Sequence, residues 1–238
     1  MRGSNPLPTL ASFVALVCCA LGASAGLAMP SGGASPSMPS MGSGNFQVTQ
    51  TPEQRAAEAF KDGLRDMKRA DEYDSAAAKE TDPKHRDKAL RKARSRYEDA
   101  RSEFGAACRN VPTMPEAWNN LGYTLRKLGS YDDALAAYER ALKLRPGYPE
   151  ALEYRGEAYL GLNRLNDAKQ VYLDLFASNR AVSNVFMTAI HNWIEEHRNA
   201  ASVDAAVFAE FVKWADERAQ IAAQTAALTR EGTAASWR

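Results

Sequence analysis

The side chains that could do chemistry in this sequence are few, and their spacing does not assemble a site. His191 and His197 are six positions apart (197 − 191) in a helical stretch, so they do not share a face as metal ligands at i, i+3 or i+4 would. Glu195 and Glu196 precede His197 directly, which is not the HExxH spacing of a zinc site. No phosphate-binding loop motif occurs in the sequence. We therefore expect no catalytic residue, metal ligand, cofactor or small-molecule substrate, which means that the protein is not an enzyme.

Cysteine usage offers little more. Cys18 and Cys19 lie in an apolar N-terminal segment, so Cys108 has no internal disulfide partner once that segment is removed. Its helical neighbours indicate a small, buried apolar residue, and the alternative is a reactive or intermolecular thiol.

The N-terminus has the pattern of an export signal. Arg2 precedes an apolar segment, residues 10–22, which is shorter than the ~20 residues that a membrane-spanning helix needs. Small residues follow at positions 23–25, where a signal peptidase acts. We expect residues 1–25 to be a cleaved signal peptide of a bacterial protein that is exported and periplasmic or secreted. The alternative is an uncleaved segment that anchors the protein to the membrane.

Composition separates a linker from a helical remainder. Residues 26–50 are rich in Pro, Ser, Gly and Met and carry no charge, which predicts a disordered linker. From Thr51 onward, Ala, Glu, Arg, Leu and Lys dominate and β-branched runs are absent, which predicts an all-α protein. Because 30 Lys and Arg balance 29 Asp and Glu, we expect no nucleic-acid partner.

The helical part contains an internal repeat of 34 residues (149 − 115). Residues 115–148 and 149–182 coincide at eight positions without a gap. The coincident pairs are Pro115/Pro149, Glu116/Glu150, Ala117/Ala151, Gly122/Gly156, Leu128/Leu162, Asp133/Asp167, Ala134/Ala168 and Tyr138/Tyr172. A mid-helix glycine costs ~1 kcal/mol relative to alanine, so we expect that a neighbouring helix approaches Gly122 and Gly156 too closely for a Cβ atom.

This repeat resembles the tetratricopeptide repeat (TPR). The residues at that family's signature positions are Trp118, Leu121, Gly122, Ala134, Tyr138, Ala141 and Pro146. The second unit departs from the signature at Arg155, Leu175 and Arg180. The resemblance implies an all-α fold, a short right-handed TPR solenoid of antiparallel helix pairs, with one unit at 115–148 and another at 149–182.

An elongated unit precedes these two. Residues 95–112 match 129–146 at Tyr97, Asp99, Ala100, Ala107 and Pro112, and Gly63 is a candidate for the position of Gly122. A unit from Ala56 to Met114 has 59 residues (114 − 56 + 1), which is 25 more than one period. We therefore expect an elongated helical hairpin over 51–114, with each helix longer by about three turns.

The C-terminal end of the solenoid is predicted to be a helical cap. The repeat pattern decays after Arg180, and Ile190 stands where a third glycine would be. Because the last unit of a solenoid must cover an open apolar end, we interpret 183–229 as capping helices and 230–238 as a flexible tail. Phe208, Phe211 and Trp214 supply the apolar face of the last helix.

The resemblance to TPR proteins implies a concave groove that holds a peptide or a partner helix. Transferred by position, the partner-binding groove residues are Asn119, Tyr123, Arg126, Lys127, Glu153, Glu157 and Leu160. The alternative is that these are ordinary helix residues that pair with one another. We expect a non-catalytic protein–protein interaction or scaffold module in the cell envelope, with a protein or peptide partner.

The alternative function is a membrane-surface adaptor, anchored by the N-terminal segment and docked through a basic helical arm at 84–96. Any membrane contact is expected only through these two parts of the chain. Acids on the opposing helix are expected to offset much of the charge of the arm: Asp62, Asp66, Asp71, Glu72 and Asp74.

Overall fold

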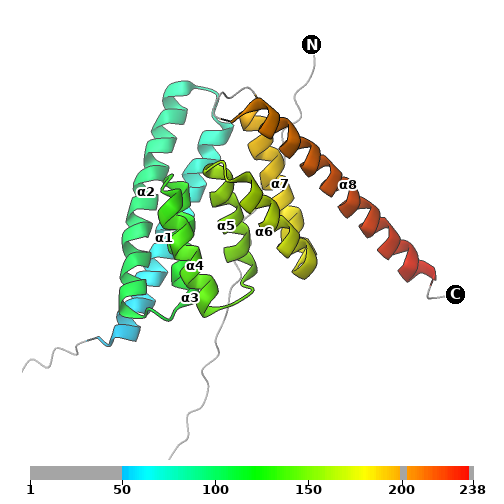
Figure 1. Ribbon diagram of the computed structural model, residues 1–238. Coiled ribbons are helices and arrows are strands. Elements are labelled where there is room, and N and C mark those ends of the chain that lie inside the picture. Colours follow the sequence, from blue (N-terminus) through cyan, green and yellow to red (C-terminus); the bar gives the residue numbers. More distant parts are fainter. Residues whose placement is uncertain (1–49, 199–202, 236–238) are drawn as a thin grey trace, which may run out of the picture. The chain divides into compact units, whose positions relative to one another are not determined.

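The computed structural model describes residues 50–198 and 203–235, and all the regular structure in these residues is helical (Figure 1). The chain divides into a unit of residues 1–49 and a unit of residues 50–238. The first unit is not described, so the predicted signal peptide and all but the last residue of the predicted linker lie outside the described residues.

The helices of the described residues follow the 34-residue period. They are α1 (Pro52–Lys79), α2 (Pro83–Asn110), α3 (Pro115–Lys127), α4 (Tyr131–Leu144), α5 (Pro149–Gly161), α6 (Leu165–Ser178), α7 (Arg180–His197) and α8 (Ala205–Ala235). Helices α3 and α5 have 13 residues each, and α4 and α6 have 14 each. The two units therefore contain the same pair of helices, displaced by one period.

Local signals set the ends of these helices. The Thr51 side chain accepts from the backbone N–H of Gln54 and the Gln54 side chain returns a bond to Thr51, which forms a capping box before α1. Pro83, Pro115 and Pro149 each begin a helix, where the missing N–H leaves no bond unmade. Equivalent turns, 34 residues apart, end α3 and α5 with a left-handed residue, Gly129 (φ 82°) in one and Asn163 (φ 57°) in the other.

The helix pairs stack into two layers, as a TPR solenoid requires. Helices α3, α5 and α7 are neighbours in one layer, in the order of the chain. Each second helix, α2, α4 or α6, packs against both its own partner and the first helix of the following pair. The predicted fold class, an all-α solenoid of antiparallel helix pairs, is confirmed.

Aromatic rings occupy the space beside the mid-helix glycines. A Cβ atom at Gly122 would lie 2.5 Å from the Tyr138 ring, and one at Gly63 would lie 2.7 Å from the Phe104 ring. At Gly156 the ring belongs to Phe186 of α7, with a distance of 2.4 Å, and not to Tyr172, which is the repeat equivalent of Tyr138. The close approach that the glycines predicted is therefore present at all three positions.

Both ends of the solenoid depart from a standard unit. Helices α1 and α2 have 28 residues each, about twice the length of α3 to α6, so the predicted elongated hairpin is confirmed. At the other end, Phe211 and Ala215 of α8 are buried in one apolar core with Phe186, Ile190 and Trp193 of α7, which forms the predicted cap. Helix α8 continues to Ala235, so the segment predicted to be a tail is helical up to that residue. No helix in the described ranges has both the length and the apolar character needed to cross a membrane.

Candidate functional site

The seven predicted groove residues all lie on α3 and α5, which are adjacent first helices of the solenoid. Arg126 of α3 forms an ion pair with Glu157 of α5. The Arg126 guanidinium also lies 5.2 Å from the ring centroid of Tyr123 and 5.4 Å from that of Tyr154. We call Tyr123, Arg126, Glu153, Tyr154 and Glu157 the α3–α5 cluster.

Glu153 is the most buried acid of this cluster, with 5% of its surface exposed. It lies one turn before Glu157 on the same face of α5. Burial raises the pKa of the Glu153 carboxyl to about 9, and the neighbouring Glu157 carboxylate adds to the shift while Arg126 opposes it. Glu153 therefore holds its proton at neutral pH and shares a hydrogen bond with Glu157.

Two further groove residues bind the elongated hairpin. The Tyr123 hydroxyl donates to Asp71 Oδ1 of α1 at 2.7 Å, and the Tyr97 hydroxyl of α2 donates to the same oxygen at 2.6 Å. Lys127 forms an ion pair with Asp74, one turn after Asp71, at 2.5 Å. Burial, followed by the nearby Asp71 carboxylate, raises the pKa of Tyr123, so its hydroxyl remains a hydrogen-bond donor.

Asn119 and Leu160 are not brought into the cluster by any contact. Asn119 is 3% exposed, and its side-chain Oδ1 atom has no partner, while its Nδ2 donates to the Asn120 side chain at 3.4 Å. Leu160 is 3% exposed and belongs to the apolar core that also contains Leu165 and Val171. Three of the seven residues, Asn119, Glu153 and Leu160, are thus buried, and a partner-binding role of the set remains a prediction.

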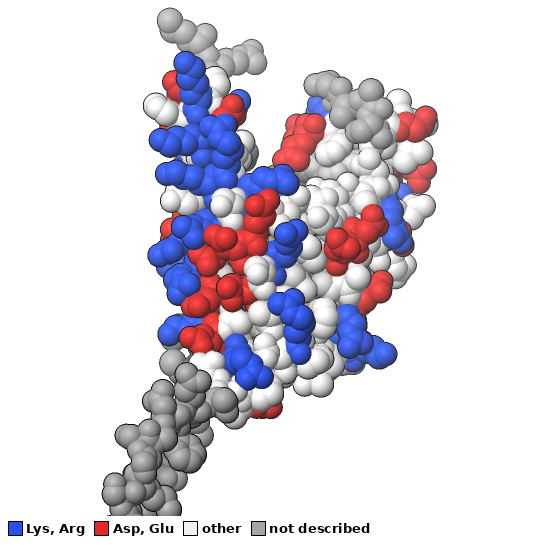
Figure 2. All heavy atoms as spheres, turned by 90° about the vertical axis from the view of Figure 1, so that its left-hand side faces the viewer, with Lys and Arg blue, Asp and Glu red and all other residues white. Residues whose placement is uncertain are grey.

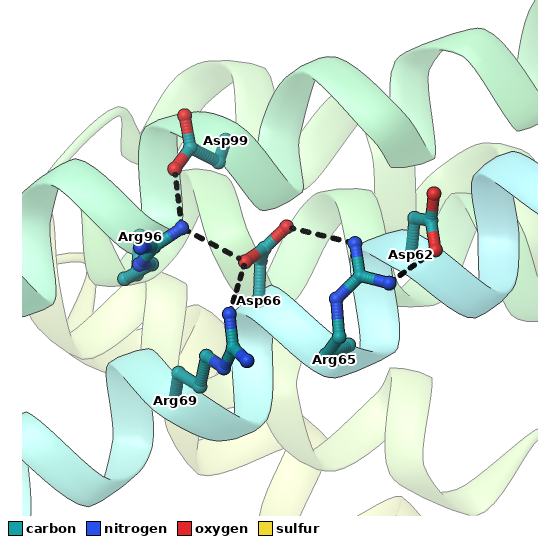
Figure 3. A network of polar contacts seen from close by, with 6 residues as sticks. All are labelled: Asp62, Arg65, Asp66, Arg69, Arg96 and Asp99. Carbon is teal, nitrogen blue, oxygen red and sulfur yellow. Dashed lines mark hydrogen bonds and ion pairs between the residues drawn. The ribbon is translucent and has the colours of Figure 1, made fainter.

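The base of the elongated hairpin holds a charged network, shown in Figure 3. Asp66 of α1 is 7% exposed and its carboxylate lies 3.2 Å from Arg96, 3.9 Å from Arg65 and 4.0 Å from Arg69. Arg96 also contacts Asp99 on its own helix at 3.2 Å. Of the basic residues at 84–96, Arg96 alone among the described residues pairs with an acid of α1. The acids of α1 therefore pair with few cations of the arm, because Asp71 accepts from Tyr97 and Tyr123 and Asp74 pairs with Lys127 of α3.

Sequence reasoning missed Asp71 and Asp74 as neighbours of the groove. The repeat supplies positions only within a standard unit, and both residues lie in the inserted part of α1. An available signal was the spacing of Asp71 and Asp74 at i and i+3, which places both on one face of α1.

The described residues offer no alternative centre for chemistry. No group of three or more His, Cys, Asp or Glu side chains is arranged to hold a metal ion in this part of the chain. Cys108 is buried, and burial raises the pKa of its thiol to about 12, which keeps it in the unreactive thiol form at neutral pH. What the α3–α5 cluster offers is two tyrosine rings, one arginine and two carboxyl groups.

Comparison with known proteins agrees with this geometry. The family model described as "Tetratricopeptide repeat" matches residues 115–148, which are α3, α4 and their connections. Residues 115–148 therefore contain a tetratricopeptide repeat. The TPR repeat is a protein-interaction module that is typically not catalytic.

One relative extends the likeness beyond that repeat. The uncharacterized protein ycf37 of Guillardia theta is 37% identical to this chain over 75 residues. The match spans 32% of this chain and 41% of the relative, which is less than half of either protein.

Proposed function

We propose that this protein is a non-catalytic scaffold that binds a basic segment of another protein along α3 and α5. The observation that carries the proposal is the acidic face of α5. Glu150, Glu153 and Glu157 lie at i, i+3 and i+7, so they share one face of the helix. Glu153 keeps its proton and Arg126 of α3 pairs with Glu157, which leaves the exposed Glu150 without an ion pair among the described residues.

A lysine or arginine of a partner would fit this surface for two reasons. Its positive charge could pair with the carboxylate that Arg126 leaves unpaired, since Arg126 pairs with Glu157 alone. The partly exposed rings of Tyr123 and Tyr154 also present faces that attract cations. Because the surface is formed by two neighbouring first helices, it extends along an axis on which a peptide or a helix can lie.

The proposed place of action is the cell envelope. Support comes from the N-terminal sequence, in which one arginine, a short apolar segment and small residues follow one another over residues 1–25. N-terminal sequencing of the protein recovered from the cell envelope tests this part. A start at residue 26 agrees with cleavage after Ala25, and a start at Met1 favours the retained anchor.

Photo-crosslinking tests the binding surface. A photoreactive amino acid is placed at Glu150 on the acidic face of α5 or, as a matched control, at Glu139 on α4; both residues are exposed and acidic. We expect discrete protein adducts from position 150 and none from position 139 after irradiation of living cells, identified by mass spectrometry. Adducts from position 139 alone would place the binding surface on the opposite layer.

Charge reversal gives an independent measurement. Glu150→Lys should reduce the recovery of the crosslinked partner in a pull-down, whereas Glu139→Lys should leave it unchanged, because the attraction between a basic segment and α5 is lost in the first variant only. Equal recovery by both variants would contradict a basic partner at this surface.

A further inference from the structure

The turn end of the elongated hairpin carries a basic surface on which most cations have no ion pair with any described residue. Its exposed cations on α2 are Lys84, Arg86, Lys88, Arg91, Lys92 and Arg94. Asp87 is the one acid of the sequence between Lys84 and Arg94. We call this set the arm surface, and Figure 2 shows Lys and Arg gathered over the upper part of the hairpin, with Asp and Glu gathered below them.

Helix geometry aims three of these cations away from the hairpin. Lys84, Lys88 and Arg91 are spaced i, i+4 and i+7 and share one face of α2. The opposite face contains Ala93 and Tyr97, which are buried against α1. The cations of the outward face therefore cannot turn into the hairpin to find a partner.

The nearby acids are engaged elsewhere. Asp71 accepts hydrogen bonds from two tyrosines, Asp74 pairs with Lys127, and Asp66 pairs with Arg96 below the arm surface. Within the described residues, no ion pair includes Lys84, Lys88 or Arg91, and the ion pair of Arg94 is with Glu98 on its own helix, at 3.3 Å. The arm surface therefore keeps a positive potential that an external anion can neutralise.

The shape of the arm favours a broad anionic surface over a small ligand. The hairpin projects as a convex rod, and Figure 2 shows a notch between its upper part and the rest of the described unit. Leu90, which is 45% exposed, lies one turn from Arg86 and from Arg94 on the flank of α2. An exposed leucine between two arginines matches the interface of a bilayer, where apolar side chains enter the acyl boundary and cations bind anionic headgroups.

We propose that the arm surface binds a phospholipid bilayer that contains anionic lipids. This proposal rests on α2 and is independent of the partner proposed for α3 and α5. Each lysine or arginine held near an anionic bilayer strengthens binding roughly five-fold. Reversing the three outward cations should therefore weaken binding by at least about 100-fold.

Vesicle co-sedimentation of the full chain tests the proposal. The arm variant is Lys84→Glu/Lys88→Glu/Arg91→Glu, and a matched control reverses three exposed lysines elsewhere, Lys61→Glu/Lys143→Glu/Lys213→Glu, with the same change in net charge. We expect the natural protein and the control variant to sediment with vesicles of phosphatidylglycerol and phosphatidylcholine at low salt, and the arm variant to remain in solution. High salt should release the bound protein, since the contact is electrostatic.

Three results would overturn the proposal. The first is no sedimentation of the natural protein with anionic vesicles at low salt. The second is equal sedimentation with vesicles of phosphatidylcholine alone, which would assign binding to apolar segments and not to the arm surface. The third is that the natural protein binds a polyglutamate-tagged protein but does not sediment with vesicles. That result would assign the arm surface to an acidic protein partner. Far-UV circular dichroism of both variants, whose altered side chains are exposed, checks that each remains folded.

Discussion

Replacing Glu153 by glutamine should make the protein more stable at neutral and alkaline pH. Glu153 is buried beside the Glu157 carboxylate. Its burial, together with the negative charge of Glu157, raises the pKa of its carboxyl to about 9, above the 4.5 of an exposed glutamate. Between those two values the folded protein keeps the proton and the unfolded chain releases it. The stability that Glu153 contributes is therefore fully present below about pH 4.5. It declines as the pH rises toward the pKa of Glu153 in the folded protein.

The size of the effect follows from the proton that unfolding releases. One proton changes the free energy of unfolding by up to about 1.4 kcal/mol per pH unit. Between pH 5 and pH 8, the loss attributable to Glu153 approaches but does not exceed about 4 kcal/mol. Glutamine removes this dependence because its amide stays neutral, and its N–H can still donate to Glu157.

Urea unfolding at pH 5, 6, 7 and 8, followed by circular dichroism, measures this difference. The curves of the natural protein and of Glu153→Gln should nearly meet at pH 5 and diverge steadily toward pH 8, with the variant more stable. Glu150→Gln, which removes an exposed carboxyl from the same helix, is the control and should run parallel to the natural protein. Titrating groups outside the α3–α5 cluster contribute equally to all three proteins and cancel in the differences.

A constant difference between Glu153→Gln and the natural protein at all four pH values would refute the reasoning. That result would mean that Glu153 is ionised in the folded protein, and hence that Arg126 stabilises both carboxylates of the α3–α5 cluster. The acidic surface proposed for partner binding would then carry one more negative charge than its geometry indicates.

Three further changes probe the fold by chemical unfolding. Gly122→Ala should lower the free energy of unfolding by about 1–2 kcal/mol, because overpacking against the buried Tyr138 ring exceeds the gain in helix propensity; an increase would mean that the ring moves freely. Asp71→Ala should cost about 2 kcal/mol, since two tyrosine hydroxyls lose a charged acceptor, and the exposed neighbour change Glu72→Ala should cost little. Asn163→Gly should be neutral or stabilise by up to about 1 kcal/mol because its φ of 57° suits glycine, and a clear loss would reveal a role for the amide.

The repeat could be predicted from sequence because its signals are local. A proline at the start of a helix, a glycine beneath a ring and a turn residue at a fixed offset each act within one unit, so their recurrence set the period. The elongated hairpin also followed, since its extra length had to lie between Gly63 and residues 95–112, where Thr81, Asp82 and Pro83 indicate a turn.

The candidate site could be predicted only as a list of positions. A position in a repeat indicates which way a side chain points, but its exposure depends on the neighbouring helices. Tyr123 meets Asp71, 52 residues away, because the inserted turns of α1 extend beside α3, and no standard unit contains those turns. Similarly, Phe186 takes the place beside Gly156 because Tyr172 packs against Trp214 of α8, at 5.5 Å between ring centroids.

The shared acceptor of Tyr97 and Tyr123 has a mechanical consequence. Asp71 Oδ1 joins the two helices of the hairpin to α3 through one atom, and the ion pair of Asp74 with Lys127 adds a second attachment one turn away. A force applied at the turn of the hairpin therefore has a direct path to α3 through these two attachments. Motion of the hairpin and the geometry of the α3–α5 cluster are thereby coupled through Tyr123.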